Sequence, residues 1–244
     1  MAQDTSFALI TGCSSGIGKA LAIAFAAKGA PVLATARHAD SLSELASKHN
    51  NIEAFSLEVS DGESMERLNN AVIKRTGTHY AATAVDLEIE EVIKLFQVNV
   101  FAVMCICQVF VPLLRRSPRA RIVQIGSVIR NVPLVWQGAY NASKAALSQY
   151  SRTLRLEVKP LGIEVIEIVT GFVRTNILQH GLYVPEGSLC LPIESVIKDL
   201  KYGGNANGML ADAYAVAVTE KLLRSRVSPE IWGGGLLVLF STTR

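Results

Sequence analysis

The sequence has few cysteines and histidines, four of each, and no pair of cysteines has the C-x-x-C spacing. A disulfide framework or a metal site built from these residues is therefore not expected. Reduced thiols in an intracellular protein are the simplest interpretation of the cysteines.

Charge is also scarce, at 18% of residues with a net charge of +3. Charge this mild and scattered excludes the basic footprint of a nucleic-acid-binding surface. No signal peptide is expected, because Asp4 is followed by an apolar run of only four residues, 7–10. We expect a cytoplasmic protein with one catalytic domain over residues 1–244, since repeats and low-complexity linkers are lacking.

A glycine-rich segment, residues 11–18, follows this apolar run and precedes an alanine-rich stretch typical of a helix, residues 19–28. In the order strand, loop and helix, the glycines let the backbone approach a diphosphate, and the N-terminus of the helix attracts its charge. The pattern predicts a dinucleotide site, with an ordinary turn as the alternative. Residues 31–36 read as the second strand of the βαβ unit.

The end of that second strand indicates the cofactor. NAD sites place an acidic residue there for the ribose 2′-hydroxyl, whereas a 2′-phosphate needs a cation. Here Arg37 follows the strand and no acid occurs before Asp40. The planar guanidinium suits a phosphate, so we expect NADP(H). A solvated surface arginine is the alternative.

Three residues farther along the chain suit carbonyl chemistry. Tyr140 and Lys144 are four residues apart, so on a helix both side chains lie on one face. The ammonium group is expected to lower the phenol pKa from its usual value of about 10. Ser127, on the preceding loop, can bind the same substrate oxygen. A solvated helix surface is the alternative for the tyrosine–lysine pair.

The remaining runs predict alternating strands and helices. The expected strands are residues 52–59, 121–125 and 163–169, and the expected helices end near Arg75 or span residues 87–114, 140–158 and 211–224. The irregular residues 176–208 suggest a substrate lid. Five apolar residues could line its pocket or pack on the core: Leu182, Tyr183, Val184, Leu189 and Leu191.

The fourth strand of such a fold is missing from its expected place. Only a polar, alanine-rich link, residues 76–85, separates the helix ending near Arg75 from the next one. Either the part of this link at residues 78–82 supplies a substitute strand, or the protein is impaired, or the sequence reflects an altered transcript or gene model.

Two apolar segments raise the question of membranes. Residues 87–114 are long enough to span a bilayer, but polar residues and Pro112 interrupt them, so a buried or subunit-packing helix is expected. Residues 231–240 are too short to span. For this C-terminal tail we expect a last core strand first, a weak membrane-surface contact second and a dimer contact third.

These features together resemble the short-chain dehydrogenase/reductase family over nearly the whole chain, and within it fungal reductases related to the 1-acyldihydroxyacetone-phosphate reductases and to tailoring enzymes of secondary metabolism. The resemblance implies an α/β fold with a doubly wound parallel sheet in three layers, of the Rossmann type, from which the fourth strand and its Asn-Asn-Ala-Gly motif are deleted. It also suggests a homodimer or homotetramer.

The resemblance assigns residues to a site. Ser127, Tyr140 and Lys144 match the catalytic residues, and Asn99 matches the asparagine that supports a proton relay. The implied cofactor-binding residues are Ile10, Gly12, Ser14, Gly16, Ile17, Gly18, Arg37, Glu58, Asn99, Tyr140, Lys144, Gly171, Val173 and Thr175. Glu58 stands where the family commonly has an aspartate beside the adenine, and Thr170 replaces the usual proline before Gly171. No metal is implied.

The leading hypothesis is an NADP(H)-dependent oxidoreductase that transfers a hydride between nicotinamide and a hydrophobic ketone or secondary alcohol, such as a lipid-like, terpenoid or polyketide metabolite. The alternative is a catalytically impaired relative that acts as a binding or scaffold protein. Binding of NADPH discriminates between them.

Overall fold

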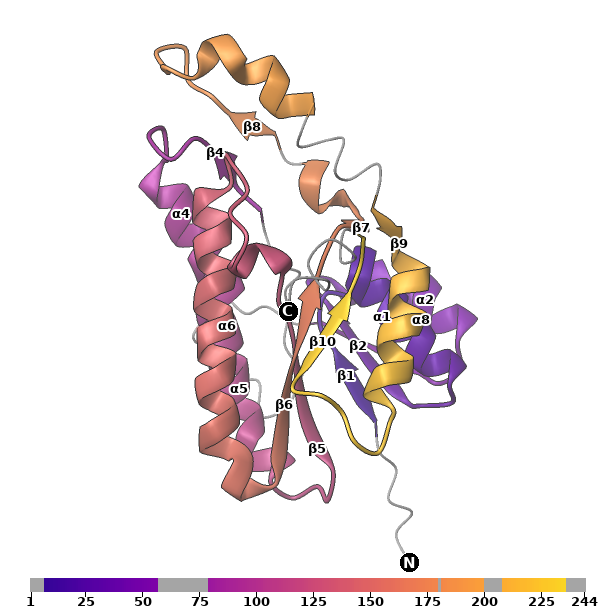
Figure 1. The fold of residues 1–244 in the computed structure, drawn as a ribbon. Coiled ribbons are helices and arrows are strands. Elements are labelled where there is room, and N and C mark those ends of the chain that lie inside the picture. The colour runs from indigo at the N-terminus through magenta and orange to yellow at the C-terminus, as the bar shows by residue number, and fades with distance from the viewer. Residues whose placement is uncertain (1–6, 57–78, 180, 200–207, 236–244) are drawn as a thin grey trace, which may run out of the picture. The chain divides into compact units, whose positions relative to one another are not determined.

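The computed structural model describes residues 7–56, 79–179, 181–199 and 208–235 (Figure 1). The chain divides into two compact units. The N-terminal unit comprises residues 1–76 and 210–223, and the C-terminal unit comprises residues 77–209 and 224–244. Each unit is described by itself below, and the expectation of one domain over residues 1–244 stays a prediction.

The N-terminal unit contains a parallel sheet in the order β1-β2-β3. Its strands are β1 (Ala8–Ile10), β2 (Val32–Ala36) and β3 (Ile52–Ser56). Its helices are α1 (Gly16–Ala27), the 3-10 turn η1 (Ala39–Leu42), α2 (Ser43–Lys48) and α8 (Ala211–Leu222). A cluster of apolar side chains from β2, α1 and α2 forms the core, as the apolar runs predict.

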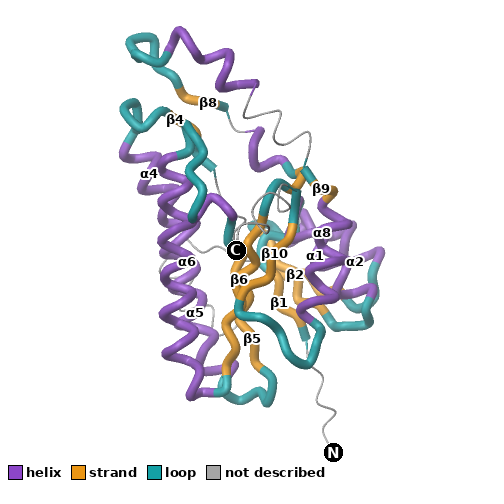
Figure 2. Tube along the Cα trace, viewed as in Figure 1, coloured by secondary structure: helices purple, strands orange, loops and turns teal. Residues whose placement is uncertain are grey.

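The C-terminal unit contains a second parallel sheet, in the order β10-β6-β5. The strands are β5 (Ala120–Ile125), β6 (Ile163–Thr170) and β10 (Glu230–Gly233). The long helix α6 (Gly138–Val158) runs alongside β5 and β6 (Figures 1 and 2) and packs on β6 through a cluster that includes Leu154, Val158, Ile163 and Val165. The helix passes through the 3-10 turn η4 (Lys159–Leu161) and ends at Gly162, whose φ of 77° is favourable for glycine.

The chain of this unit also forms several short elements outside the second sheet. They are η3 (Val128–Arg130), β7 (Val173–Arg174), η5 (Asn176–Gln179), β8 (Leu182–Tyr183), η6 (Leu191–Ile193) and β9 (Met209–Leu210). The predicted lid therefore contains β8, η5 and η6, while residues 180 and 200–207 lie outside the described residues.

The link that stands where the fourth strand is expected does form a short strand, but this strand does not substitute for the expected one. Two residues make β4 (Ala81–Ala82), which pairs in parallel with β8 and joins neither three-stranded sheet. Ala82 also bridges to Gln137, just before α6. Within the described residues, β1 and β5 are each the edge strand of their sheet. The parallel strands that the structure describes thus form two separate three-stranded sheets, β1-β2-β3 and β10-β6-β5.

The long apolar helix is interrupted at its middle. It consists of α4 (Ile89–Phe96), a π-helical turn η2 (Gln97–Phe101) and α5 (Ala102–Leu114). By length and composition alone, the helical run Ile89–Leu114 could cross a membrane, and it is the one such run in the described part of the chain. In the structure, α4 and η2 pack against α6, and α5 packs against β5, but only 28% of the apolar window of this run is buried. The prediction of a buried helix therefore holds for a minority of the window, and subunit packing stays a prediction.

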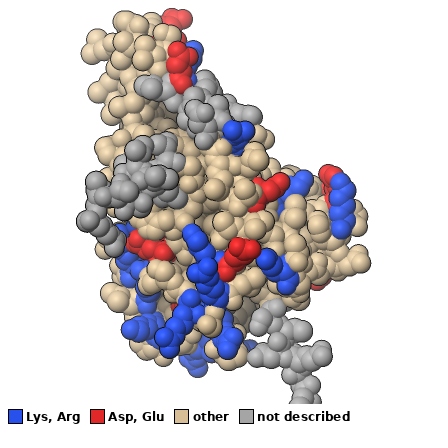
Figure 3. Space-filling view, turned by 45° about the vertical axis from the view of Figure 1, so that its right-hand side comes forward, with Lys and Arg blue, Asp and Glu red and all other residues tan. Residues whose placement is uncertain are grey.

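The C-terminal tail supplies a core strand, the first of its three predicted roles, since β10 pairs with β6. Residues 236–240 of the predicted tail lie outside the described residues, as do Glu58, the end of the predicted third strand and the helix expected up to Arg75. On the face shown in Figure 3, basic and acidic side chains are interspersed among uncharged ones.

Candidate active site

Helix α6 places the tyrosine and the lysine one helical turn apart. The Lys144 Nζ lies 5.9 Å from the centroid of the Tyr140 ring. Lys144 is buried and donates a hydrogen bond of 2.9 Å to the carbonyl oxygen of Ile125, at the end of β5. The predicted common face is therefore present, and the lysine joins α6 to the carboxyl end of a parallel strand, where such sheets hold ligands.

The prediction that Lys144 lowers the pKa of Tyr140 is wrong for this structure. Burial raises the pKa of Tyr140 to about 12. Burial also lowers the pKa of Lys144 to about 8, and the charge of Glu167 acts in the opposite direction. The reason is that burial disfavours both charged forms, while the ammonium group is directed at the Ile125 carbonyl. Tyr140 is therefore protonated at neutral pH.

The loop after β5 carries Ser127. The chain leaves the strand at Ile125, passes Gly126, and begins η3 with Ser127 as its N-cap. The serine Oγ accepts a hydrogen bond from the Ile129 amide at 3.4 Å, and η3 packs on α6. This long bond leaves the hydroxyl proton available for a substrate oxygen, as a capping serine allows.

The π-helical turn η2 carries Asn99. Its Nδ2 donates to Ser143 Oγ at 3.1 Å, and Ser143 Oγ donates to the carbonyl oxygen of Tyr140 at 2.8 Å. Asn99 is thereby linked to the first turns of α6, beside the tyrosine. Single π-turns inside helices occur frequently at functional sites, and here the turn holds a buried amide at that position.

Sequence reasoning missed two neighbours of the tyrosine. The ring of His79 lies 4.9 Å from the ring of Tyr140, between centroids, at an angle of 59°. His79 Nε2 and Gln137 Oε1 are 3.2 Å apart, within hydrogen-bonding distance. His79 belongs to the link at residues 76–85, for which a strand was only one of three alternatives, so no periodicity pointed to it. The presence of a histidine within that link was the only signal.

The loop after β6 is held against β10. Gly171 donates to the carbonyl oxygen of Gly233 at 2.8 Å, and a Cβ at Gly171 would lie 2.2 Å from the Gly235 carbonyl oxygen. Val173 is buried, and Thr175 Oγ1 accepts from the Ile177 amide at 3.4 Å. Gly171 is thus required by a close approach of two backbones.

The glycine loop of the N-terminal unit has the backbone shape that a diphosphate needs. Gly12 and Gly16 have positive φ values of 72° and 57°. A Cβ at Gly18 would lie 2.4 Å from the Gly12 carbonyl oxygen, so only glycine lets α1 start this close to the loop. Ser15, the N-cap of α1, makes no side-chain capping bond, which leaves amide groups of the first turn for an anion. Ile10 and Ile17 are partly buried, whereas Ser14 is exposed.

Arg37 follows the last residue of β2 and is exposed. Its carbonyl oxygen accepts a hydrogen bond from Ser56 Oγ at 2.9 Å, which ties its backbone to the end of β3. Arg37 thus lies where the carboxyl ends of β2 and β3 meet. The glycine loop has the backbone shape for the diphosphate of a nicotinamide dinucleotide, and Arg37 is a cation at the strand end where the ribose of such a cofactor is expected.

The candidate residues fall into two groups. The structure brings Asn99, Tyr140 and Lys144 together around α6 of the C-terminal unit, with Ser127 on the loop that leads into η3, which packs on that helix. That unit also contains Gly171, Val173 and Thr175. The glycine loop and Arg37 belong to the N-terminal unit.

Comparison with known proteins identifies the class. A family model described as short chain dehydrogenase matches residues 6–181. The fold is that of this family: a short-chain dehydrogenase from Streptomyces avermitilis superposes with a TM-score of 0.81 and 28% identity, covering 98% of this chain and 92% of the other. The chain therefore belongs to the short-chain dehydrogenase family of oxidoreductases, with the Rossmann-like α/β fold.

Two curated relatives are similar over most of their length. The NADPH-dependent 1-acyldihydroxyacetone phosphate reductase of Schizosaccharomyces pombe is 38% identical over 213 residues, covering 80% of this chain and 71% of the relative. The short-chain dehydrogenase srdE of Neurospora crassa is 35% identical over 246 residues, covering 95% of this chain and 84% of the relative. The resemblance to fungal members of the family is confirmed.

Proposed function

We propose that the protein is an NADP(H)-dependent oxidoreductase that interconverts a hydrophobic ketone and its secondary alcohol. The observation that carries the proposal is the pair on α6, a buried Lys144 with its ammonium 5.9 Å from the ring of Tyr140. Ser127 precedes the turn that packs on the same helix.

The side chains have separate roles in this reaction. Tyr140, protonated at neutral pH because burial raises its pKa to about 12, donates its proton to the carbonyl oxygen during reduction. Ser127 Oγ donates a hydrogen bond to the same oxygen and holds it in place. Lys144 places a positive charge near the phenolate that forms, and Asn99 orients the first turns of α6 through Ser143. The bound nicotinamide supplies the hydride.

NADP(H) is favoured over NAD(H) by Arg37. The guanidinium is exposed after β2, where the ribose 2′-substituent is bound in dinucleotide folds. The S. pombe relative carries NADPH-dependence in its name, which supports the same preference. Ile10, Gly12, Ser14, Gly16, Ile17 and Gly18 would hold the diphosphate, while Gly171, Val173 and Thr175 would hold the nicotinamide half.

The substrate class follows from the lid. Leu189 is 91% exposed and Leu191 41% exposed, so apolar surface is available on this segment. Such surface is suited to a lipid-like, terpenoid or polyketide substrate. The name of the S. pombe relative refers to an acylated dihydroxyacetone phosphate, a ketone with a long apolar chain. A cytoplasmic homodimer or homotetramer, with weak membrane contact through the C-terminal tail, completes the proposal.

The proposal is tested by titrating NADPH and NADH while nicotinamide fluorescence is followed. Tight binding of NADPH and weak binding of NADH is expected. Arg37→Ala should weaken NADPH binding by roughly tenfold, the contribution of one hydrogen-bonded charge, and leave NADH binding unchanged. Lys48→Ala is the matched control, since Lys48 is an exposed cation of the same unit that pairs with Glu44. Binding of neither nucleotide would favour the scaffold alternative, which the comparisons do not support.

A further inference from the structure

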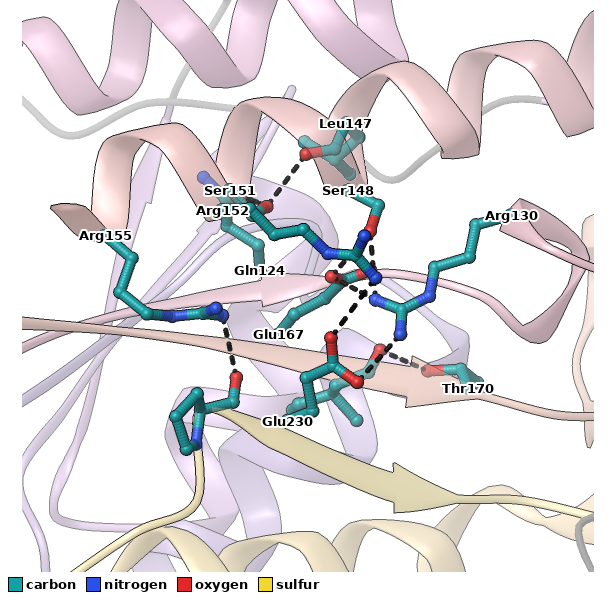
Figure 4. A network of polar contacts seen from close by, with 12 residues as sticks. Gln124, Arg130, Leu147, Ser148, Ser151, Arg152, Arg155, Glu167, Thr170 and Glu230 are labelled. Atoms are coloured by element: carbon teal, nitrogen blue, oxygen red, sulfur yellow. Dashed lines mark hydrogen bonds and ion pairs between the residues drawn. The ribbon is translucent and has the colours of Figure 1, made fainter. Parts of the chain in front are cut away.

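A buried polar network joins η3, the turn that follows Ser127, to α6, β6 and β10 (Figure 4). Arg130, the last residue of η3, donates through Nη1 to Glu167 of β6 and, at 2.9 Å, to Ser148 of α6. Its Nη2 donates to Glu230 of β10 at 2.8 Å. Only 3% of the Arg130 side chain and none of the Glu167 side chain is exposed. One arginine therefore connects the turn after Ser127 to a helix and two strands.

Stability alone does not explain these charges. Ile163, Val165 and Glu167 occupy alternate positions of β6, so they lie on the face that packs on α6. The first two are apolar core residues. A buried ion pair is commonly no more stabilising than an apolar pair of similar volume. A glutamate at this core position therefore calls for a role beyond folding.

The position of the carboxylate suggests that role. A Cβ at Gly126 would lie 2.2 Å from Glu167 Oε1, and Oε1 accepts no hydrogen bond from any residue that the structure describes. Gly126 is not among the glycines with positive φ, so this close approach is what requires its missing side chain. The carboxylate fills the space beneath the residue that precedes Ser127, and Arg130 clamps the other end of the same loop.

The network also reaches the catalytic lysine. Ser148 follows Lys144 by one helical turn on α6 and donates to Glu167 at 2.9 Å. The negative charge of Glu167 raises the pKa of Lys144 against the effect of burial. Of the charged groups in the network, Glu167 is thus the one that favours a protonated lysine.

We propose that Arg130 and Glu167 are positioning residues of the active site, which fix the loop at residues 126–130 so that Ser127 faces the substrate oxygen. Glu167 also provides the negative charge that balances Lys144. The role of Ser127 and Lys144 rests on the proposed function. Neither Arg130 nor Glu167 needs to touch substrate or cofactor.

The first test measures amide hydrogen exchange of residues 126–131 in the protein without added nucleotide. Glu167→Gln and Arg130→Met should each increase exchange there by roughly tenfold, as expected when one charge-assisted hydrogen bond is lost. Glu164→Gln is the matched control, because Glu164 also lies on β6 but pairs with Arg121 near the amino ends of β5 and β6, with the Arg121 Nε 2.6 Å from the Glu164 Oε2. Unchanged exchange in both test variants would overturn the proposal.

The second test is the pH profile of turnover. Glu167→Gln should lower kcat without changing the KM for NADPH, and should move the alkaline limb to lower pH, because Lys144 loses its balancing charge. Arg130→Met retains that charge and removes a positive one, so its alkaline limb should not move to lower pH. If the alkaline limbs of Glu167→Gln and Arg130→Met both coincide with that of Glu164→Gln, Glu167 does not balance the charge of Lys144, and this part of the proposal is wrong.

A double variant separates positioning from folding. Arg130→Met with Glu167→Leu replaces the pair by apolar groups and should restore the thermal midpoint, while loop exchange stays high and kcat stays low. Recovery of kcat together with the midpoint would show a purely structural pair and overturn the proposal. Should even the unmodified protein lack turnover, the proposed function fails, but the exchange result still decides whether the pair orders the loop.

Discussion

The glycine loop in the N-terminal unit and the serine loop in the C-terminal unit both follow a parallel strand, yet they are built in different ways. The glycine loop is shaped by backbone conformation, with positive φ at Gly12 and Gly16 and close contact at Gly18. Its surroundings are apolar side chains. The serine loop is held by buried charges, those of Arg130 and Glu167.

This difference follows from what each loop would bind. A diphosphate is bound by main-chain amides, so a loop of the right backbone shape suffices. A substrate oxygen is bound by the hydroxyl of one side chain, Ser127, whose direction depends on how firmly its loop is held. The comparison predicts that added atoms disturb the structure of the glycine loop, whereas the loss of hydrogen bonds disturbs the structure of the serine loop.

The largest effect is expected at the tyrosine. Tyr140→Phe keeps the ring beside His79 and Lys144 but removes the proton that is transferred. Turnover should fall by about 10²- to 10⁴-fold, the range for a positioned acid or base, while NADPH affinity changes little. Steady-state kinetics and fluorescence titration measure the two quantities. Tyr150→Phe, on the same helix, is the control, and retained turnover in Tyr140→Phe would contradict the assignment.

The next effect concerns the buried lysine and pH. The pKa of Lys144 is lowered from 10.5 to about 8 in the folded protein, so between these values the unfolded chain binds the extra proton. Stability should therefore rise with pH in this window, by about 2 kcal/mol between pH 7.5 and 10. Above pH 10, Tyr140 acts in the opposite direction because its pKa is raised. Urea unfolding at several pH values measures the slope.

Lys144→Met provides the comparison for that slope. Without the ammonium group, the rise in stability between pH 7.5 and 10 should be absent, and the variant should be more stable than the unmodified protein at pH 7.5. Equal slopes in the two proteins would show that Lys144 is not the group responsible.

The glycine loop is expected to respond more weakly, through added volume. Gly18→Ala places a Cβ 2.4 Å from the Gly12 carbonyl oxygen, which a rigid backbone relieves only by moving. Overpacking of this kind costs about 1–3 kcal/mol, so NADPH should bind roughly tenfold or more weakly. Gly29→Ala is the control: its φ of 81° carries a backbone cost, but no atom lies within 4 Å, and NADPH binding should not change.

The sequence predicted most of the fold because apolar runs mark buried strands directly. Strands at residues 8–10, 32–36, 120–125 and 163–170 lie where the runs indicate. A strand at residues 78–82 was only one of three alternatives, because the two alanines of β4 carry no apolar alternation and its pairing with β8 is fixed by tertiary contact. The interruption of the long helix at Gln97–Phe101 also has no sequence signature in this chain.

The candidate site was predictable where spacing carries the chemistry, as for Tyr140 and Lys144. The buried residues that hold the loop of Ser127 in place, Arg130 and Glu167, could not be predicted in this way. Glu167 was read as part of a buried strand, although a charged residue among Val and Ile at a core position is itself a signal of a buried partner. That partner, Arg130, is 37 residues away, and no local pattern connects the two. The pKa of Tyr140 was mispredicted for a similar reason, because burial is set by packing rather than spacing.

The smallest effect is expected at the predicted lid, in the C-terminal unit. Ser188 Oγ donates to Asp86 Oδ2 at 2.6 Å, and Thr83 donates to the same carboxylate. These bonds lower the pKa of Asp86 and connect the lid to the segment that follows β4. Asp86→Ala should raise the KM for the organic substrate by roughly two- to fivefold, the size of one lost hydrogen bond, with kcat unchanged.

Glu194→Ala is the control for the predicted lid, because Glu194 makes a local ion pair with Lys198 at 2.8 Å, one helical turn along the same segment. Its KM should match that of the unmodified protein. The result sharpens the comparison of the two loops. A change in kcat rather than KM would mean that Asp86 supports the serine loop. The hydrogen bonds of Asp86 and those of Glu167 would then both act on the serine loop, and not separately on the predicted lid and the serine loop.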